Sequence, residues 1–533
     1  MKIHLIASIV VGVFVAAAPA VAQTPERQVV DDAAQAMGGR DQVLSARTLL
    51  VEGAGHDMNV GQSLRYDELG LQSDVYQIRD YKRAYDLTNQ RGRFEAIRQA
   101  QYPFYQGDPA QRQIQGFDAG TVFNVAANGN AVRVFAPGQI AARRVEYLRH
   151  PLTIVRAALQ PSARLSNVRT QGSDRLVDVT SDGVTLTLAI DAATKLPSRV
   201  IQMVDSATLG DTAISTEFRD YKTVSGLQLP TRITTKTDRA VSADIRIQKQ
   251  SLNSDVADLA APAAAANAQP PANAGAPPAA APTEAKEIAK GVWFVTGTTH
   301  HSLLVEFGDH LMMIEAPNNE RTAAVLAKAK ELRPNKPVTV LLVTHHHGDH
   351  TSGVRDAVAN APIREIITHS SNVAYVNDVL NRPHTINPDA LAKKGGAKNV
   401  KITSIGDTGA VKDATMTMNL YHILDNSHAD SMLMIYFPQG RILTEADIYM
   451  PNDARNIIPG EPLGHAPWNQ NLMGNINLRK LQVDWMAPIH GEYTPFSLFV
   501  ENTIAMTQYL PGTEPRPTTG AAGGGRAGGE GGN

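Results

Sequence analysis

The chain has 533 residues, of which 43% are hydrophobic, and it carries a formal net charge of −2 with no cysteine. This length is ample for two domains with buried cores. The missing cysteines exclude disulfides and thiolate metal ligands, and the balanced charge argues against a nucleic-acid partner. No segment after the N-terminal stretch approaches the length of a membrane-spanning helix, so we expect no membrane span.

The first residues have the pattern of an export signal. An apolar stretch at 5–18 follows Met1 and Lys2 and closes on Ala20-Val21-Ala22 before Gln23. A short apolar run that ends in a small-x-small sequence is typical of a cleaved signal peptide, and it is too short to span a membrane. We therefore expect residues 1–22 to be a signal peptide and the mature protein to be periplasmic or secreted by a bacterium.

Residues 23–256 predict an N-terminal domain that is mostly antiparallel β. A helix is expected at 25–37, and apolar and polar residues then alternate at 184–190 and 241–247, as in strands with one buried face. The sequence FRDYKTVSGLQLPTRITT at 218–235 resembles periplasmic lipoprotein-carrier domains, which are open half-barrels with a greasy concave face. The resemblance implies a hydrophobic ligand in this domain; the alternative is a structural accessory domain.

Residues 257–283 are almost entirely Ala, Pro, Asn, Gln and Gly, with proline pairs at 270–271 and 277–278. Such a segment buries too little apolar surface to fold, so it predicts a linker between two domains. Thirteen of the 16 histidines follow it, which places the chemistry in a second domain at 284–512. The Gly-rich residues 513–533 predict a disordered tail.

The second domain contains a dense group of metal-ligand residues. A helix is expected at 320–332, and a β-branched strand at 338–343 leads directly into Thr-His-His-His-Gly-Asp-His at 344–350. Four side chains of this segment are candidate ligands, namely His345, His347, Asp349 and His350. Imidazole and carboxylate donors without thiolate suit zinc, with iron or manganese as alternatives, in a hydrolytic centre. The competing interpretation is a His-rich polar loop that binds nothing.

This segment resembles the His-x-His-x-Asp-His signature of the metallo-β-lactamase superfamily. Three later residues match the family's remaining ligands in order: His428 precedes an apolar strand, Asp447 follows one, and His490 ends Met-Ala-Pro-Ile-His. The resemblance implies an αββα sandwich, so the chain as a whole is expected to be α+β. It also implies two divalent metal ions. The first would be held by His345, His347 and His428, and the second by Asp349, His350 and His490, with Asp447 between them.

Two such ions would generate a hydroxide near neutral pH, and Asp349 is the candidate catalytic residue that orients it or moves its proton. Candidate substrate contacts are His300 and His301 in a turn, and Tyr449 and Tyr493 near the later ligands; a solvated turn or packing is the alternative for each. His346 is expected to pack rather than to bind a metal.

The bridging aspartate favours an exported hydrolase that cleaves an ester, lactone or thioester in a small-molecule acyl substrate. Two alternatives remain at this point: a β-lactam amide hydrolase, and a lipid- or ligand-binding protein with a secondary metal site. One departure from the resemblance follows the strand at 311–314, where Glu315-Ala316-Pro317 stands in place of the Asp-Gly type turn of many relatives.

Overall fold

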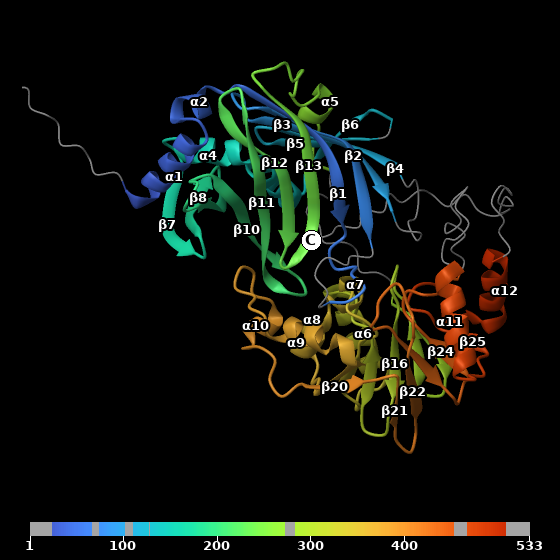
Figure 1. The fold of residues 1–533 in the computed structure, drawn as a ribbon. Helices are drawn as coiled ribbons and strands as arrows, with labels where there is room; N and C mark the ends of the chain where they lie inside the picture. Colours follow the sequence, from blue (N-terminus) through green and yellow to red (C-terminus); the bar gives the residue numbers. More distant parts are fainter. Residues whose placement is uncertain are drawn as a thin grey trace, which may run out of the picture.

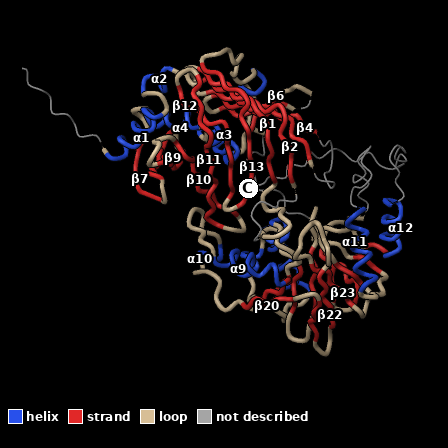
Figure 2. Tube along the Cα trace, in the orientation of Figure 1, coloured by secondary structure: helices blue, strands red, loops and turns tan. Residues whose placement is uncertain are grey.

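The computed structural model describes residues 24–66, 74–101, 110–126, 128–271, 283–451 and 466–507. The predicted signal peptide and tail lie outside these ranges, as do residues 272–282 of the predicted linker. The chain forms two halves, an upper one built from the N-terminal residues and a lower one built from the C-terminal residues (Figure 1). Both halves are rich in strands (Figure 2).

Thirteen strands of the described N-terminal residues form one sheet in the order β6-β5-β4-β3-β2-β1-β13-β12-β11-β10-β9-β8-β7. Every neighbouring pair is antiparallel. The strands are β1 (Thr48–Met58), β2 (Val75–Asp86), β3 (Arg91–Ala100), β4 (Ala110–Asp118), β5 (Thr121–Val125), β6 (Ala131–Val134), β7 (Arg164–Gln171), β8 (Asp174–Ser181), β9 (Val184–Asp191), β10 (Pro197–Ser206), β11 (Gly210–Val224), β12 (Leu227–Thr237) and β13 (Ala240–Leu252).

The chain's own helices cover the apolar face of this sheet. They are α1 (Pro25–Ala36), α2 (Arg40–Ser45), α3 (Pro137–Leu148) and α4 (Pro151–Leu159). The side chain of Thr24 caps α1 by accepting a hydrogen bond from the Arg27 amide. Leu152 and Ile154 of α4 are fully buried in one core with Leu186 and Leu188 of β9. The alternation seen in the sequence at 184–190 therefore has its physical cause in this helix layer.

The start of the predicted linker belongs to the N-terminal half. Residues 263–266 form a short helix, α5 (Ala263–Ala266), which contacts β5 and β6. Leu259 and Ala265 are buried. Part of the segment expected to be a linker thus packs on the N-terminal sheet, because alanine can form a helical turn and pack closely even where large apolar residues are few.

The C-terminal half contains two mixed sheets. The first has the order β14-β15-β16-β17-β18-β19-β20 and is parallel from β17 onward; the second has the order β21-β22-β23-β24-β25-β26. The strands are β14 (Ala285–Ala289), β15 (Val292–Val295), β16 (Ser302–Glu306), β17 (Leu311–Ile314), β18 (Val338–Leu342), β19 (Glu365–His369), β20 (Lys401–Ile405), β21 (Thr408–Lys412), β22 (Thr417–His422), β23 (Leu433–Phe437), β24 (Ile442–Thr444), β25 (Trp485–Met486) and β26 (Thr494–Pro495).

The two sheets face each other across a shared core and carry helices on their outer faces (Figures 1 and 2). The helices are α6 (Asn319–Leu332), α7 (Gly348–Thr351), α8 (Val354–Asn360), the 3₁₀ turn η1 (Ser370–Asn372), α9 (Val373–Asn381), α10 (Ala390–Lys393), α11 (Ala466–Leu478) and α12 (Phe496–Thr507). This confirms the predicted αββα sandwich and the α+β class. Among the described helices, none is both long and apolar enough to cross a membrane.

Candidate metal centre

The candidate ligands lie where strands of the two facing sheets end. Buried β18 runs directly into the His345 to His347 turn, and α7 then carries Asp349 and His350. His428 precedes β23, Asp447 follows β24, and His490 follows β25. Segments that are far apart in sequence therefore deliver their polar residues to one place, as is common at strand ends in layered α/β structures.

Seven residues named from the sequence meet there, together with His300. They form two groups, in each of which the potential ligand atoms lie within 4.8 Å of one another. The first group consists of His345, His347, His428 and Asp447, and the second of His300, Asp349, His350 and His490.

Asp447 faces both groups with different oxygens. Its Oδ2 lies 2.9 Å from Nε2 of His345 and 2.9 Å from Nε2 of His428. Its Oδ1 lies 3.0 Å from Nε2 of His350 and 2.6 Å from Nε2 of His490. One carboxylate placed between two sets of imidazoles has the geometry of a bridging ligand.

Four of the imidazoles are oriented by a partner on the side away from the cluster. Their contacts are Thr344 Oγ1 to His345 Nδ1 at 3.0 Å, His347 Nε2 to the Ser63 carbonyl at 3.0 Å, His350 Nδ1 to Glu315 Oε2 at 2.8 Å, and His490 Nδ1 to the Thr299 carbonyl at 3.0 Å. An imidazole that donates one N–H in this way presents its other nitrogen to a metal.

His347 gives a direct test of whether a metal fits. Its ring is fully buried, and among the described residues its Nδ1 has no hydrogen-bond partner. A buried nitrogen without a partner is costly unless something occupies its lone pair. The nitrogen and oxygen donors of both groups suit zinc, iron or manganese, so the residues fit two divalent ions.

The charges in the cluster are consistent with cation binding. Burial lowers the pKa of His345 to about 3, which favours the neutral ring that a metal ligand must have, and it lowers the pKa of neighbouring His300 to about 4. Burial also works against a charged His350, yet the carboxylates of Asp447 and Asp349 outweigh it and raise the His350 pKa well above its usual value. The second group therefore lies in a negative field that favours a positive charge.

Glu315 supports the second group and was not identified from the sequence. It is fully buried, accepts a hydrogen bond from the Thr344 amide at 2.7 Å, and contacts His350 Nδ1 at 2.8 Å. Its backbone has a φ of 67°, a left-handed conformation that is strained for a residue with a side chain. The signal available was an acidic residue directly after the apolar strand β17, in the position where the resemblance departs.

The candidate substrate contacts lie in different surroundings. His300 contacts Asp349 Oδ2 at 3.2 Å and so joins the second group. His301 Nδ1 accepts a hydrogen bond from the Gly297 amide, and its ring packs on Phe294. The His301 side chain therefore stabilises the turn in which it lies.

The two tyrosines and His346 lie in packed surroundings. Tyr449 is buried against Phe499, and its hydroxyl accepts a hydrogen bond from Asn502. Tyr493 stacks on Trp485 with ring centroids 4.9 Å apart. His346 Nε2 lies 3.1 Å from Ser63 Oγ, outside both ligand groups, as expected for a packing residue.

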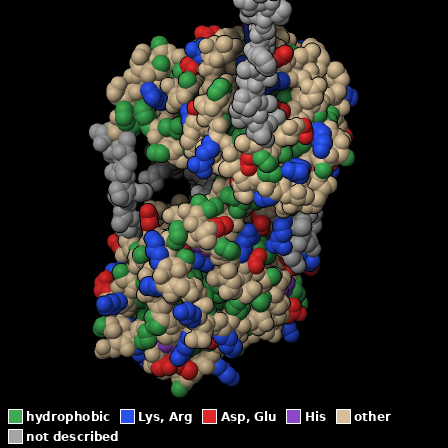
Figure 3. Space-filling model, turned by 90° about the vertical axis from the view of Figure 1, so that its left-hand side faces the viewer, with side chains coloured by type: hydrophobic (Ala, Val, Ile, Leu, Met, Phe, Trp, Pro, Cys, Tyr) green, Lys and Arg blue, Asp and Glu red, His purple; other side chains and the backbone are tan. Residues whose placement is uncertain are grey.

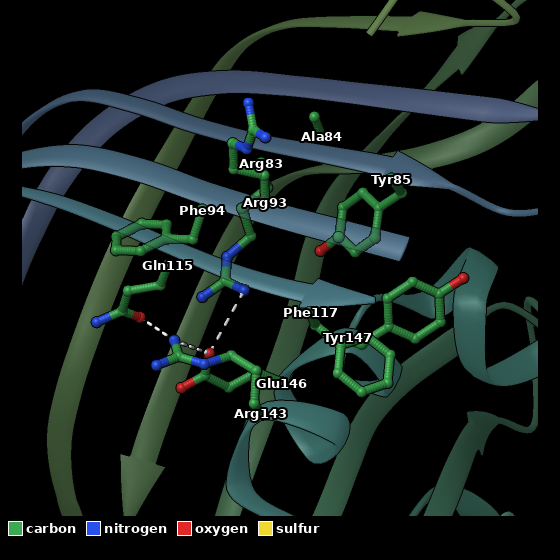
Figure 4. A pocket seen from close by; sticks show the side chains of 11 residues that line it. Arg83, Ala84, Tyr85, Arg93, Phe94, Gln115, Phe117, Arg143, Glu146 and Tyr147 are labelled. Carbon is green, nitrogen blue, oxygen red and sulfur yellow. Dashed lines mark hydrogen bonds and ion pairs between the residues drawn. The ribbon is translucent and has the colours of Figure 1, made fainter. Parts of the chain in front are cut away.

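The N-terminal half contains a small pocket between the β2–β4 region and α3 (Figure 4). Arg83, Arg93 and Arg143 line it beside aromatic rings, and Arg143 contacts Gln115 and Glu146. The lining is charged, whereas a lipid tail would need an apolar cavity. The hydrophobic ligand expected for this domain therefore stays a prediction.

Comparison with known proteins identifies the fold of the C-terminal half. Residues 295–490 match the family model of the metallo-beta-lactamase superfamily. A linear primary-alkylsulfatase from a Pseudomonas species is 20% identical over 238 residues, which are 38% of this chain and 44% of that protein. The chain thus spans less than half the length of this curated relative.

Similar solved structures cover 42–43% of this chain. A rubredoxin oxygen:oxidoreductase from Desulfovibrio gigas matches with a TM-score of 0.33 and 13% identity, covering 42% of this chain and 62% of that one. A metallo-beta-lactamase from Pontibacter korlensis matches with a TM-score of 0.32 and 16% identity over 43% and 100% of the two chains. A metallo-beta-lactamase from Hirschia baltica matches with a TM-score of 0.31 and 17% identity, covering 42% of this chain and 98% of that one. The family-model match at residues 295–490, together with the two facing sheets and their outer helices, gives the C-terminal half the metallo-β-lactamase fold.

Proposed function

We propose that this protein is a binuclear metal-dependent hydrolase that cleaves an ester bond. The observation that carries the proposal is the position of Asp447, whose two oxygens each face two imidazoles of a different ligand group. A domain that only bound a ligand would not need two complete groups joined by one carboxylate. Zinc is the first choice of metal, with iron or manganese as alternatives.

The first ion would be held by His345, His347 and His428, and the second by Asp349, His350 and His490, with Asp447 shared. Two ions there would lower the pKa of a water molecule toward neutrality and polarise the substrate's carbonyl or equivalent group.

The protein's own groups would do the rest. The carboxylate of Asp349 is the most open member of the cluster, with 41% of its side chain exposed. It is therefore placed to orient the attacking water and to accept its proton. His300, which contacts Asp349 Oδ2, would hold that carboxylate in position.

The class of ester is the finer part of the proposal. A carboxylic ester, lactone or thioester is the first choice, because a carboxylate shared by both ligand groups favours these substrates over a β-lactam amide. A sulfate ester is the second candidate, and the observation that favours it is the match to a linear primary-alkylsulfatase. The same arrangement of ligands can serve either, since both reactions are attacks of an activated water on an electron-poor centre.

The test is the initial rate of hydrolysis by the zinc-loaded protein on lactone, thioester, aryl ester, alkyl sulfate and β-lactam substrates. We expect one ester class to be cleaved and the rate to disappear on metal removal and in Asp447→Ala. Asp484→Ala serves as the control, because Asp484 pairs with Arg441 near the surface of the same domain. Selective cleavage of the β-lactam, or a rate that survives in Asp447→Ala, would refute the proposal.

We also propose that the protein is exported. The support is the sequence of residues 1–22, an apolar stretch that ends in Ala-x-Ala.

A further inference from the structure

The loop that joins β1 to β2 crosses from the N-terminal half to the metal centre. Its described part, residues 59–66, appears in Figure 1 as the blue segment that descends from the upper half to lie beside α7. Ser63 is buried there, 7% exposed, although it belongs to a connection between two strands of the other domain. Connections normally run over the surface, so a buried one requires an explanation.

The loop contacts a metal-ligand candidate directly. The Ser63 carbonyl lies 3.0 Å from Nε2 of His347, and carbonyls only accept, so the ring must donate from Nε2. That choice of tautomer leaves the lone pair on Nδ1, the buried nitrogen that has no hydrogen-bond partner among the described residues. The N-terminal domain thus determines which nitrogen of His347 faces the first ligand group.

A second contact involves Asp349. The side-chain Nε2 of Gln62 donates to Asp349 Oδ1 at 3.2 Å, while His300 contacts Oδ2 at 3.2 Å. The two oxygens of this carboxylate are therefore held from two different domains. Gln62 lies on the open side of the cluster, beside the residue proposed to orient the attacking water.

The three residues that follow Ser63 fasten the loop to the C-terminal half. The Asp430 amide donates to the Leu64 carbonyl at 2.9 Å, and Arg65 pairs with the Asp430 carboxylate at 3.0 Å. Tyr66 packs edge-on against Tyr375 and donates to Asp378 at 2.5 Å. Anchors of this kind hold the Ser63 carbonyl against His347 with little freedom to move.

We propose that residues 59–66 of the N-terminal domain complete the metal centre of the C-terminal domain. Ser63 is the positioning residue for His347, and Gln62 is the positioning residue for Asp349. The inference rests on the proposed metal-dependent function. Its consequence is that the N-terminal domain acts as a structural part of the active site, and that the C-terminal domain by itself holds its metals more weakly. Partners that orient a metal-bound histidine typically contribute 10- to 100-fold to metal affinity, which sets the size of the expected effect.

The test uses the full-length protein and reads metal binding rather than activity. Two variants weaken the loop: Arg65→Ala removes its ion pair, and a loop variant replaces residues 60–65 with alternating glycine and serine. Metal content and the rate of zinc transfer to a chromogenic chelator are measured for each, together with the visible spectrum of the cobalt-substituted protein. We expect one of the two ions to leave about 10- to 100-fold faster in the loop variant, with a changed cobalt spectrum, and a smaller acceleration in Arg65→Ala.

A control at another contact separates positioning from general loosening. Asp211→Ala removes the hydrogen bonds that the Asp211 carboxylate accepts from the Thr385 and Ile386 amides, at a different contact between the same two halves. This variant should release zinc at the wild-type rate.

Unchanged metal release and an unchanged cobalt spectrum in the loop variant would overturn the inference. Equal acceleration in Asp211→Ala would also overturn it. Should the loop variant fail to fold, Arg65→Ala decides alone, and release within twofold of wild type counts against the inference. A wild-type protein that binds no metal would instead refute the proposed function, so the two failures are distinguishable.

Discussion

Replacement of Glu315 by glutamine should weaken the second metal site without disturbing the fold. The carboxylate accepts two hydrogen bonds with separate oxygens, from the Thr344 amide at 2.7 Å and from His350 Nδ1 at 2.8 Å. Glutamine has nearly the same shape but only one accepting oxygen. In Glu315→Gln one of the two donors must lose its partner, or His350 must change its tautomer.

Each outcome has a comparable cost. An unpaired buried donor costs about 1–3 kcal/mol, which corresponds to roughly 5- to 150-fold in affinity if the strain is relieved only when the metal leaves. If His350 instead accepts a hydrogen bond from the glutamine amide, its proton moves to Nε2, the nitrogen that faces Asp447 at 3.0 Å. That nitrogen could then bind a metal only after losing the proton, and affinity falls by the same order.

The assay is metal content after dialysis, followed by competition with a chelator of known affinity, with thermal unfolding measured on the metal-free protein. Glu306→Gln is the matched control, because Glu306 accepts from Arg333 and Lys336 through separate oxygens in the same domain. We expect Glu315→Gln to lose one ion about 5- to 150-fold more readily than Glu306→Gln. Two ions bound with wild-type affinity in Glu315→Gln would show that this contact does not orient His350.

Three further predictions concern other parts of the chain. Asp349→Asn should lower kcat more than metal content, and the reverse order would remove Asp349 from proton transfer. Burial lowers the pKa of His150 to about 3. Between pH 6.5 and about 3 only the unfolded chain therefore binds this proton, so the free energy of unfolding decreases as the pH is lowered. The loss is about 1.4 kcal/mol at pH 5.5 relative to pH 8, and urea unfolding of His150→Asn should lack this part of the slope; an identical slope would refute the assignment. N-terminal sequencing of the exported protein should begin at Gln23, and an uncleaved Met1 would contradict the signal-peptide prediction.

The candidate ligands could be picked out from the sequence because their signals are local. His345, His347, Asp349 and His350 lie within six residues, and the three later ligands each adjoin an apolar strand that is visible as a run of hydrophobic residues. The resemblance to the metallo-β-lactamase superfamily implied that these residues converge, and strand ends in a layered sandwich do meet at one edge. The structure does bring all seven together.

What the sequence could not show depends on contacts between distant segments. Ser63 and His347 are 284 residues apart, and no periodicity or spacing relates them. The sequence also did not show that helices of the N-terminal half cover the apolar face of its sheet. An alternating strand has the same pattern whether a helix or a ligand covers that face. The sequence did show an acidic residue, Glu315, directly after an apolar strand. Its backbone φ of 67° could not be predicted from the residue type.

The contacts between the two halves are arranged so that the metal centre and the docking of the domains depend on each other. Charged side chains of both signs lie along the seam (Figure 3), and one pair across it is Arg382 with Asp238 at 2.8 Å. This pair is bidentate, and its side chains are 20% and 25% exposed. The 59–66 loop differs, because Ser63 within it is buried and its carbonyl contacts the candidate ligand His347. Linkage is reciprocal, so a loop that raises metal affinity 10- to 100-fold is itself held more tightly by the bound metal, by the same factor. A metal-dependent clamp between the domains follows from the same contact that orients His347.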